Sequence, residues 1–135
     1  MKKFVLYCDG ASRGNPGPSA YGFVIYENGQ TIAQEGQLLG EVTNNIAEYE
    51  GLLRGLARAV SLQGEEITVK SDSELLVRQL KGQYKVKAPH LKKLHEQALQ
   101  LMTKFKKTEI LHIRRELNDV ADSLCNQALD GRPIR

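Results

Sequence analysis

A chain of 135 residues with 41% apolar and 26% charged side chains has the size and composition of one ordinary globular domain. Such a domain folds without a disulfide or a structural metal, and no apolar run in it approaches the roughly 20 residues of a membrane span. The net charge of +3 permits a polyanionic partner without requiring one. Cys8 and Cys125 fit no metal-ligand spacing. The first apolar run is too short for a signal peptide, so we expect a cytoplasmic protein.

The first elements in the chain are three predicted strands, over residues 3–9, 20–27 and 31–39. A glycine- and proline-rich turn follows the first strand, and the Asn28–Gly29 pair between the other two is a hairpin signal. These features favour an antiparallel meander. A helix is predicted next, over residues 45–62, because apolar side chains recur there every three or four positions. Those side chains are Ile46, Tyr49, Leu53, Leu56 and Val60.

The second half of the chain alternates strands with helices. A strand over residues 66–72 is followed by helices over 73–81 and 90–105, a strand over 108–114 and a last helix over 118–129. This order predicts an α/β fold whose sheet is antiparallel at one side and connected by crossovers at the other. No repeat, low-complexity tract or linker interrupts it. We expect a single domain over residues 1–135, with a core over about 2–129 and a short tail over 130–135.

Carboxylates stand at the ends of several of these elements. Asp9 ends the first predicted strand, Asp72 ends the fourth, and Glu48 lies in the first turn of the long helix. Asp119 and Asp122 lie in the first turns of the last helix. Sites in open α/β sheets form outside the carboxyl ends of strands. Asp9 and Asp72 would therefore converge if the first and fourth strands are neighbours.

Each of these acids also has a purely structural interpretation. Asp9 could belong to a turn, Glu48 could pair with Asn45 in a capping box, Asp72 could cap the next helix, and the acids of the last helix could favour its dipole. Clustered carboxylates repel one another, however, and a divalent cation removes that cost. Oxygen ligands without Cys or His favour Mg²⁺ or Mn²⁺ over Zn²⁺. Enzymes that cleave phosphodiester bonds commonly use two such ions.

Four segments resemble, in order, the motif blocks of type 1 ribonuclease H. They read DGASRGNPG, TNNIAEYEGLLRGL, VKSDSELLVRQL and NDVADSLCNQAL, and the resemblance covers about residues 4–129. It implies the ribonuclease H-like fold, a five-stranded mixed sheet flanked by helices. It also implies endonucleolytic cleavage of the RNA strand of RNA–DNA hybrids with two Mg²⁺ ions, Mn²⁺ being the alternative.

The resemblance also implies which residues form the site. The metal-binding acids of the family match Asp9, Glu48, Asp72 and Asp122. Spacing alone does not choose between Asp119 and Asp122, whereas the family motif selects Asp122. The expected nucleic-acid contacts are Gly10, Ser12, Asn15, Thr43, Asn44 and Asn45. Gly10 and its neighbours would let the backbone approach the sugar–phosphate chain closely.

Three departures from the family pattern affect the expected grip on the substrate. The basic protrusion of larger members is reduced to KGQYKVKAPH. The histidine loop before the last helix is short, so Arg115 stands nearest the place of the histidine and is a candidate catalytic residue, while His112 is expected inside a strand with a structural role. Glu74 replaces a frequent glutamine and would repel phosphate or recruit a cation. Lysines that could rebuild the phosphate grip are Lys85, Lys87, Lys92 and Lys93.

Two rival functions come from other classes. A non-catalytic module could hold hybrids or double-stranded RNA, but a binder gains nothing from carboxylates that face phosphate. A nucleotide-binding enzyme would need a phosphate loop with a lysine, which GASRGNPGPS lacks. The expected partner is thus an RNA–DNA hybrid, and double-stranded RNA and RNA–DNA junctions are left open as further substrates. We expect a monomer that does not contact a membrane.

Overall fold

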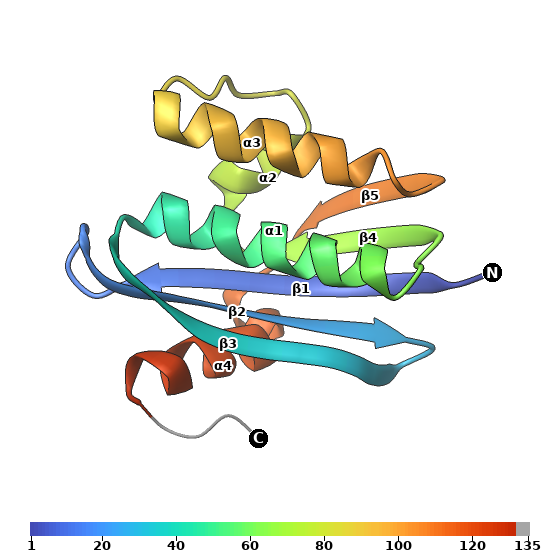
Figure 1. Ribbon diagram of the computed structural model, residues 1–135, viewed down its shortest axis with the longest axis horizontal. Coiled ribbons are helices and arrows are strands. Elements are labelled where there is room, and N and C mark those ends of the chain that lie inside the picture. Colours follow the sequence, from blue (N-terminus) through green and yellow to red (C-terminus); the bar gives the residue numbers. More distant parts are fainter. Residues whose placement is uncertain (132–135) are drawn as a thin grey trace.

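The computed structural model describes residues 1–131, which form a mixed five-stranded sheet with helices on both faces (Figure 1). The strand order is β3-β2-β1-β4-β5, with β1 and β2, and β2 and β3, paired antiparallel. The pairs β1–β4 and β4–β5 are parallel. The strands are β1 (Lys3–Ser12), β2 (Gly17–Glu27), β3 (Gln30–Val42), β4 (Glu66–Ser71) and β5 (Lys107–His112). The predicted fold class is confirmed.

The helices are divided between the two faces of the sheet. Three of them lie on one face, and the last lies on the other, against β2 (Figure 1). They are α1 (Asn44–Ser61), α2 (Glu74–Leu80), α3 (Pro89–Met102) and α4 (Asp119–Leu129), with a 3₁₀ turn, η1 (Arg115–Asn118), before α4. No helix within residues 1–131 is both long and apolar enough to cross a membrane.

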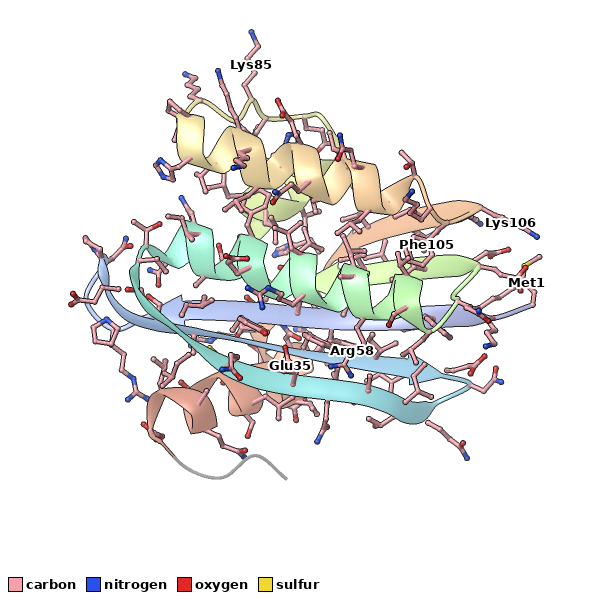
Figure 2. All side chains as sticks on the ribbon, in the orientation of Figure 1. Met1, Glu35, Arg58, Lys85, Phe105 and Lys106 are labelled. Carbon is pink, nitrogen blue, oxygen red and sulfur yellow. The ribbon has the colours of Figure 1, made fainter. Side chains whose placement is uncertain are left out.

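The main core lies between the sheet and the three-helix face. Alternate residues of a strand point to opposite faces, so Phe4, Leu6 and Cys8 of β1 are buried under α1. Phe105, predicted as the end of the third helix, lies after α3 but still packs into this core (Figure 2). The boundaries of that helix and of β5 thus differ from the prediction by a few residues.

The first strand is longer than predicted. Residues up to Ser12 pair with β2, so the glycine-rich segment begins as strand and turns only after it. The pairing of β1 with β4, in contrast, ends at Tyr7 and Lys70. Asp9 therefore does not end β1, but it lies beyond the last residue of β1 that pairs with β4. The prediction was wrong because Gly10 adopts ordinary strand geometry, and Gly14, with φ +96°, is the glycine that uses its conformational freedom in the turn.

Helix α1 approaches β1 closely because two glycines remove side chains from the contact. A Cβ atom at Gly10 would lie 2.2 Å from the backbone carbonyl carbon of Ala47, and one at Gly51 would lie 2.6 Å from the carbonyl oxygen of Asp9. The close approach brings Glu48, next to Ala47 on α1, to the same end of the sheet as Asp9.

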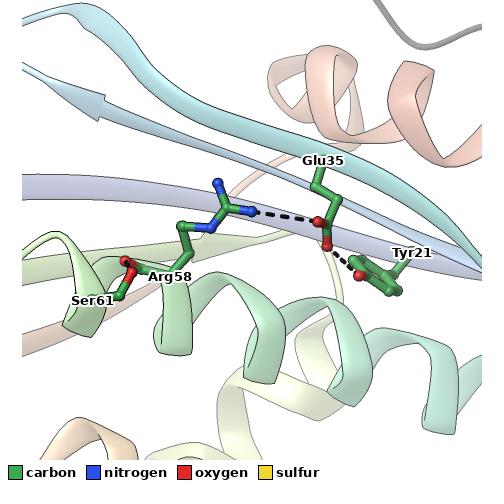
Figure 3. Close-up of polar contacts among 4 residues, drawn as sticks. All are labelled: Tyr21, Glu35, Arg58 and Ser61. Carbon is green, nitrogen blue, oxygen red and sulfur yellow. Dashed lines mark hydrogen bonds and ion pairs between the residues drawn. The ribbon is translucent and has the colours of Figure 1, made fainter.

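A polar cluster also ties α1 to β2 and β3. The hydroxyl of Tyr21 donates a hydrogen bond to Glu35, and the other carboxylate oxygen of Glu35 lies 3.5 Å from Nη2 of Arg58 on α1 (Figure 3). The Arg58 guanidinium also lies 6.0 Å from the ring centroid of Phe23. These contacts fix the helix on which Glu48 is carried.

Candidate active site

Acids from both faces of the sheet gather where β1 and β4 separate. Asp9 and Asp72 follow the last paired residues of these strands, Glu48 comes from α1, and Asp122 comes from α4. The carboxyl group of Asp122 lies close enough to that of Asp9 to raise the pKa of Asp9. Asp9, Glu48 and Asp72 all lie close enough to the buried Cys8 thiol to raise its pKa, in addition to the effect of burial. The convergence expected from the sequence is therefore present.

Burial and nearby negative charge make two of these acids, Asp9 and Glu48, costly to ionise. Burial, followed by the charge of Asp72 and the neighbouring Asp122 carboxyl, raises the pKa of Asp9 to about 8. Burial raises the pKa of Glu48 to about 7, although the Ser73 hydroxyl, 3.2 Å from its Oε1, lowers it in part. A bound cation would reverse both shifts, because it favours the ionised carboxylates.

The capping roles that the sequence left open for Glu48 and Asp72 belong to other residues. Thr43 caps α1 by accepting a hydrogen bond from the Ile46 N–H at 3.3 Å, so the proposed Asn45–Glu48 capping box is wrong. Ser73 caps α2 and also donates to Glu48, which leaves Asp72 outside the cap. Thr43, two residues before Asn45, and Ser73, one residue after Asp72, are therefore the cap acceptors.

The two acids of the last helix are separated by the structure. Asp119 is exposed and lines a small cavity of about 160 Å³ with Tyr7 and Tyr26. Asp122 is half-buried and reaches Asp9. The assignment of Asp122 to the site stays a prediction, and its position beside Asp9 is the reason to test it first.

Asn118 is a residue of the site that sequence reasoning missed. It is 1% exposed, and its Nδ2 donates to the Cys8 carbonyl oxygen at 2.9 Å and to Asp72 Oδ2 at 3.1 Å. In the sequence it looked like the first residue of a helix. Only its place in the NDVAD motif block could have marked it.

The expected nucleic-acid contacts form a cross-linked pair of segments. Asn15 Oδ1 accepts from the Asn44 backbone N–H at 3.0 Å, and Asn44 Oδ1 accepts from the Ser12 N–H at 2.7 Å. The side-chain Nδ2 groups of Asn15 and Asn44 make no hydrogen bond within residues 1–131 and remain available as donors. Donors held in this way suit phosphate or hydroxyl oxygens. Thr43 and Asn45 flank Asn44, and both are half-buried.

Two of the expected contacts have structural roles of their own. The Ser12 hydroxyl donates to the Val42 carbonyl at 2.9 Å and so joins β1 to the end of β3. Gly10 makes room for α1 on one face of β1. Direct contact of either residue with a nucleic acid stays a prediction.

The remaining candidates lie around the rim. Arg115 is exposed on η1, and Glu74 is exposed at the start of α2, 3.6 Å from Arg78. His112 is the last residue of β5, not an interior one, and its Nε2 lies 3.3 Å from the backbone oxygen of Asp72. The segment between α2 and α3 carries exposed lysines, and Lys85 projects from it away from the sheet (Figure 2). Lys87, Lys92 and Lys93 are exposed as well.

The donors at this site fit a hard divalent cation, although they do not form a complete cage. Within residues 1–131, no group of three or more Asp, Glu, His or Cys side chains is arranged to hold a metal by itself. Mg²⁺ does not require one, because it is commonly held by one or two carboxylates together with water and substrate phosphates. All four candidate ligands offer oxygen only, and the raised pKa values of Asp9 and Glu48 favour added positive charge.

Comparisons of the sequence with known proteins point to one family. Residues 7–128 match the family model described as Reverse transcriptase-like. A bifunctional protein of Mycobacterium tuberculosis is 44% identical over 131 residues, which are 96% of this chain and 36% of that protein. Ribonuclease HI of Halobacterium salinarum is 41% identical over 125 residues, which are 92% of this chain and 63% of that protein. The chain thus spans less than two thirds of the length of these relatives.

Solved structures agree with this result. The crystal structure of RNase H1 from Halobacterium salinarum has a TM-score of 0.93 at 39% identity and covers 96% of this chain and 98% of its own. LC11-RNase H1, solved in complex with an RNA/DNA hybrid, has a TM-score of 0.89 at 40% identity and covers 95% and 97%. The fold, with acids where β1 and β4 part, defines the ribonuclease H-like class. Within this class, the chain belongs to the ribonuclease HI family.

Proposed function

We propose that this chain is an endoribonuclease that cleaves the RNA strand of RNA–DNA hybrids with the help of divalent metal ions. The observation that carries the proposal is the convergence of Asp9, Glu48, Asp72 and Asp122 at the point where β1 and β4 separate. In this arrangement the pKa values of Asp9 and Glu48 are raised, and a protein that did not bind cations would gain nothing from it. The hybrid bound by LC11-RNase H1 supports the choice of substrate.

The four acids would hold two ions, Mg²⁺ or alternatively Mn²⁺. When bound, such ions activate a water molecule for in-line attack and stabilise the leaving 3′ oxygen. The protein itself orients the ligands: Ser73 donates to Glu48, and Asn118 donates to Asp72. Burial of Asp9 and Glu48 keeps bulk water away from part of the site.

The nucleic acid would be bound by groups on both sides of the acids. The Nδ2 groups of Asn15 and Asn44, with Thr43 and Asn45, would contact sugar hydroxyls and phosphates. Contacts with the 2′-hydroxyl would distinguish RNA from DNA. The lysines of the α2–α3 segment would contact phosphates, which position the substrate without reading its sequence.

Two exposed residues, Arg115 and Glu74, complete the proposed site at its rim. We assign Arg115 a place beside the reacting phosphate, and we expect Glu74 to weaken the local phosphate grip or to recruit a cation. A single domain over residues 1–135, a monomer, a cytoplasmic location and activity on double-stranded RNA or RNA–DNA junctions all remain to be tested. The last residues, 132–135, lie outside the described part of the chain.

One experiment separates this function from a binding module. The purified protein is incubated with labelled RNA–DNA hybrid, double-stranded RNA and double-stranded DNA, in Mg²⁺, in Mn²⁺ and with a chelator. The proposal requires metal-dependent cutting of the RNA strand of the hybrid and no cutting with the chelator. Tight binding of the hybrid without any cutting in either metal would show a binding module instead.

A further inference from the structure

Asn118 lies where the next hydrogen-bonded residue pair between β1 and β4 would be. The parallel pairing of these strands ends at Tyr7 and Lys70. Beyond that pair, Asn118 Nδ2 donates to the carbonyl oxygen of Cys8 on β1 and to the Asp72 carboxylate, which follows β4. One amide group therefore spans the gap between the separating strands and holds an acid of the site.

These two bonds fix the orientation of the amide. Both partners are acceptors, so the opposite orientation would place Asn118 Oδ1 against two oxygens. In the observed orientation Oδ1 is buried and has no hydrogen-bond partner within residues 1–131. A buried acceptor without a donor costs free energy, and folded proteins rarely keep one without a reason. Within the described residues Oδ1 therefore lacks the donor that a buried acceptor needs, while Nδ2 keeps both of its bonds.

We propose that Asn118 is a positioning residue that sets the Asp72 carboxylate relative to Asp9, and that its Oδ1 accepts a hydrogen bond from a water molecule of the working site. The inference rests on the proposed function, because it concerns the same acids. Asn118 is the last residue of η1 and directly precedes α4, the helix that carries Asp122. A single short segment therefore controls the placement of one acid and supplies another. A polar buried pocket is the setting in which a bound water satisfies such an acceptor.

The test compares two changes at Asn118 with a control of similar kind. Asn118→Ala removes the amide, and Asn118→Asp keeps its shape but replaces the donor with an oxygen. The control, Thr108→Val, removes one hydroxyl hydrogen bond, to the Met102 carbonyl at 3.2 Å, at the opposite end of the sheet. Each protein is assayed for kcat and KM on an RNA–DNA hybrid. Without nucleic acid, each is also assayed for the rise in melting temperature that Mg²⁺ causes.

The expected result is specific to Asn118. Both changes lower kcat by about 10–100-fold, the usual effect of removing a group that orients a metal ligand, and leave KM within about threefold, since the substrate contacts remain. The Mg²⁺-induced rise in melting temperature is smaller in both than in the wild type. Thr108→Val matches the wild type in kcat and in this rise, even where its own melting temperature is lower.

Other results would overturn the proposal. If the Asn118 variants match Thr108→Val in either kcat or the Mg²⁺-induced rise, Asn118 is merely structural. The positioning role is also rejected if Mg²⁺ does not raise the melting temperature of the wild type. If the wild type does not cut the hybrid at all, the proposed function fails, and the melting data alone then decide on Asn118. If Asn118→Ala does not fold, Asn118→Ser replaces it under the same criteria.

Discussion

Asp9 is the acid of the site whose pKa is raised by two neighbouring acids as well as by burial. Burial, with Asp72 and Asp122 close by, raises its pKa to about 8, against an ordinary value of 3.8. Between these values the folded protein keeps a proton that the unfolded chain has released. The free energy of unfolding therefore falls as the pH rises from about 4 to about 8 in the metal-free protein.

Asp9→Asn removes this dependence and should stabilise the metal-free protein at high pH. We expect the variant to melt above the wild type at pH 9, with a difference that shrinks as the pH falls and is smallest below 3.8, where the wild-type carboxyl becomes protonated in both states. Thermal melts in chelator across this pH range measure the effect, and Asp119→Asn, at an exposed acid, is the control. A variant less stable than the wild type at pH 9 would contradict the proposed repulsion.

Asp119 and Asp122 offer a second contrast between single residues. Asp122→Ala should lose most of the cleavage activity, because its carboxyl lies beside Asp9. Asp119→Ala should keep near-normal kcat and cost at most about 0.3–1 kcal/mol of helix-dipole stabilisation. Steady-state kinetics and urea unfolding of both variants check the ranking. The opposite order of activity would mean that the wrong acid of α4 has been assigned to the site.

At the scale of elements, the site depends on how closely α1 packs on β1. In Gly10→Ala the new Cβ would lie 2.2–2.4 Å from the backbone of Ala47 and Glu48, so the helix must move. We expect a loss of about 1–3 kcal/mol of stability, together with lower kcat because Glu48 moves with α1. Denaturant unfolding and hybrid cleavage measure the two effects.

Gly55→Ala on the same helix is the matched control. There the new Cβ would meet the end of the Leu6 side chain at 2.6 Å, and that side chain can turn aside. The control should lose less stability and keep its kcat. If Gly10→Ala behaves like Gly55→Ala in both measurements, close packing of α1 does not position Glu48.

The elements show what the sequence could and could not predict. Periodicity and turn signals predicted the strands and helices along the chain, because buried faces leave a regular pattern, and the resemblance to the family motifs selected the four acids. The end of β1 was missed because Gly10 looks like a turn residue until its packing against Ala47 is known. Asn118 was missed because its bonds join segments 110 and 46 residues apart in the chain. Such long-range hydrogen bonds leave no local pattern.

At the scale of the whole molecule, positive charge and acid charge lie in different places. Five of the ten exposed lysines lie in the α2–α3 segment and on α3, whereas the half-buried acids lie where β1 and β4 separate. A polyanion that reached the acids could therefore be held by lysines outside them. Because the lysines and the acids lie apart, we predict that substitutions can change hybrid binding without changing the cleavage step.

Lys85→Gln together with Lys87→Gln should raise KM for the hybrid at moderate salt and leave kcat nearly unchanged. Each lost phosphate contact should also flatten the dependence of log affinity on log salt, by roughly 0.9 on B-form DNA. Affinity is measured across a salt series in an Asp72→Asn background, so that the hybrid is not cut. An unchanged slope and affinity would remove these lysines from the binding surface.

The central claim is that acids brought together at the separation of β1 and β4 hold the metal ions that cut RNA. The most direct measurement is cleavage of one end-labelled RNA–DNA hybrid by wild type, Asp72→Asn and Asp119→Ala in Mg²⁺ and in chelator. We predict that wild type and Asp119→Ala cut the RNA strand in Mg²⁺ but not in chelator. The cleavage rate of Asp72→Asn should be lower by more than about 100-fold, because about 100-fold is the upper end of the loss for residues that only support metal ligands. Near-wild-type turnover by folded Asp72→Asn, or cutting that persists in chelator, would contradict the account.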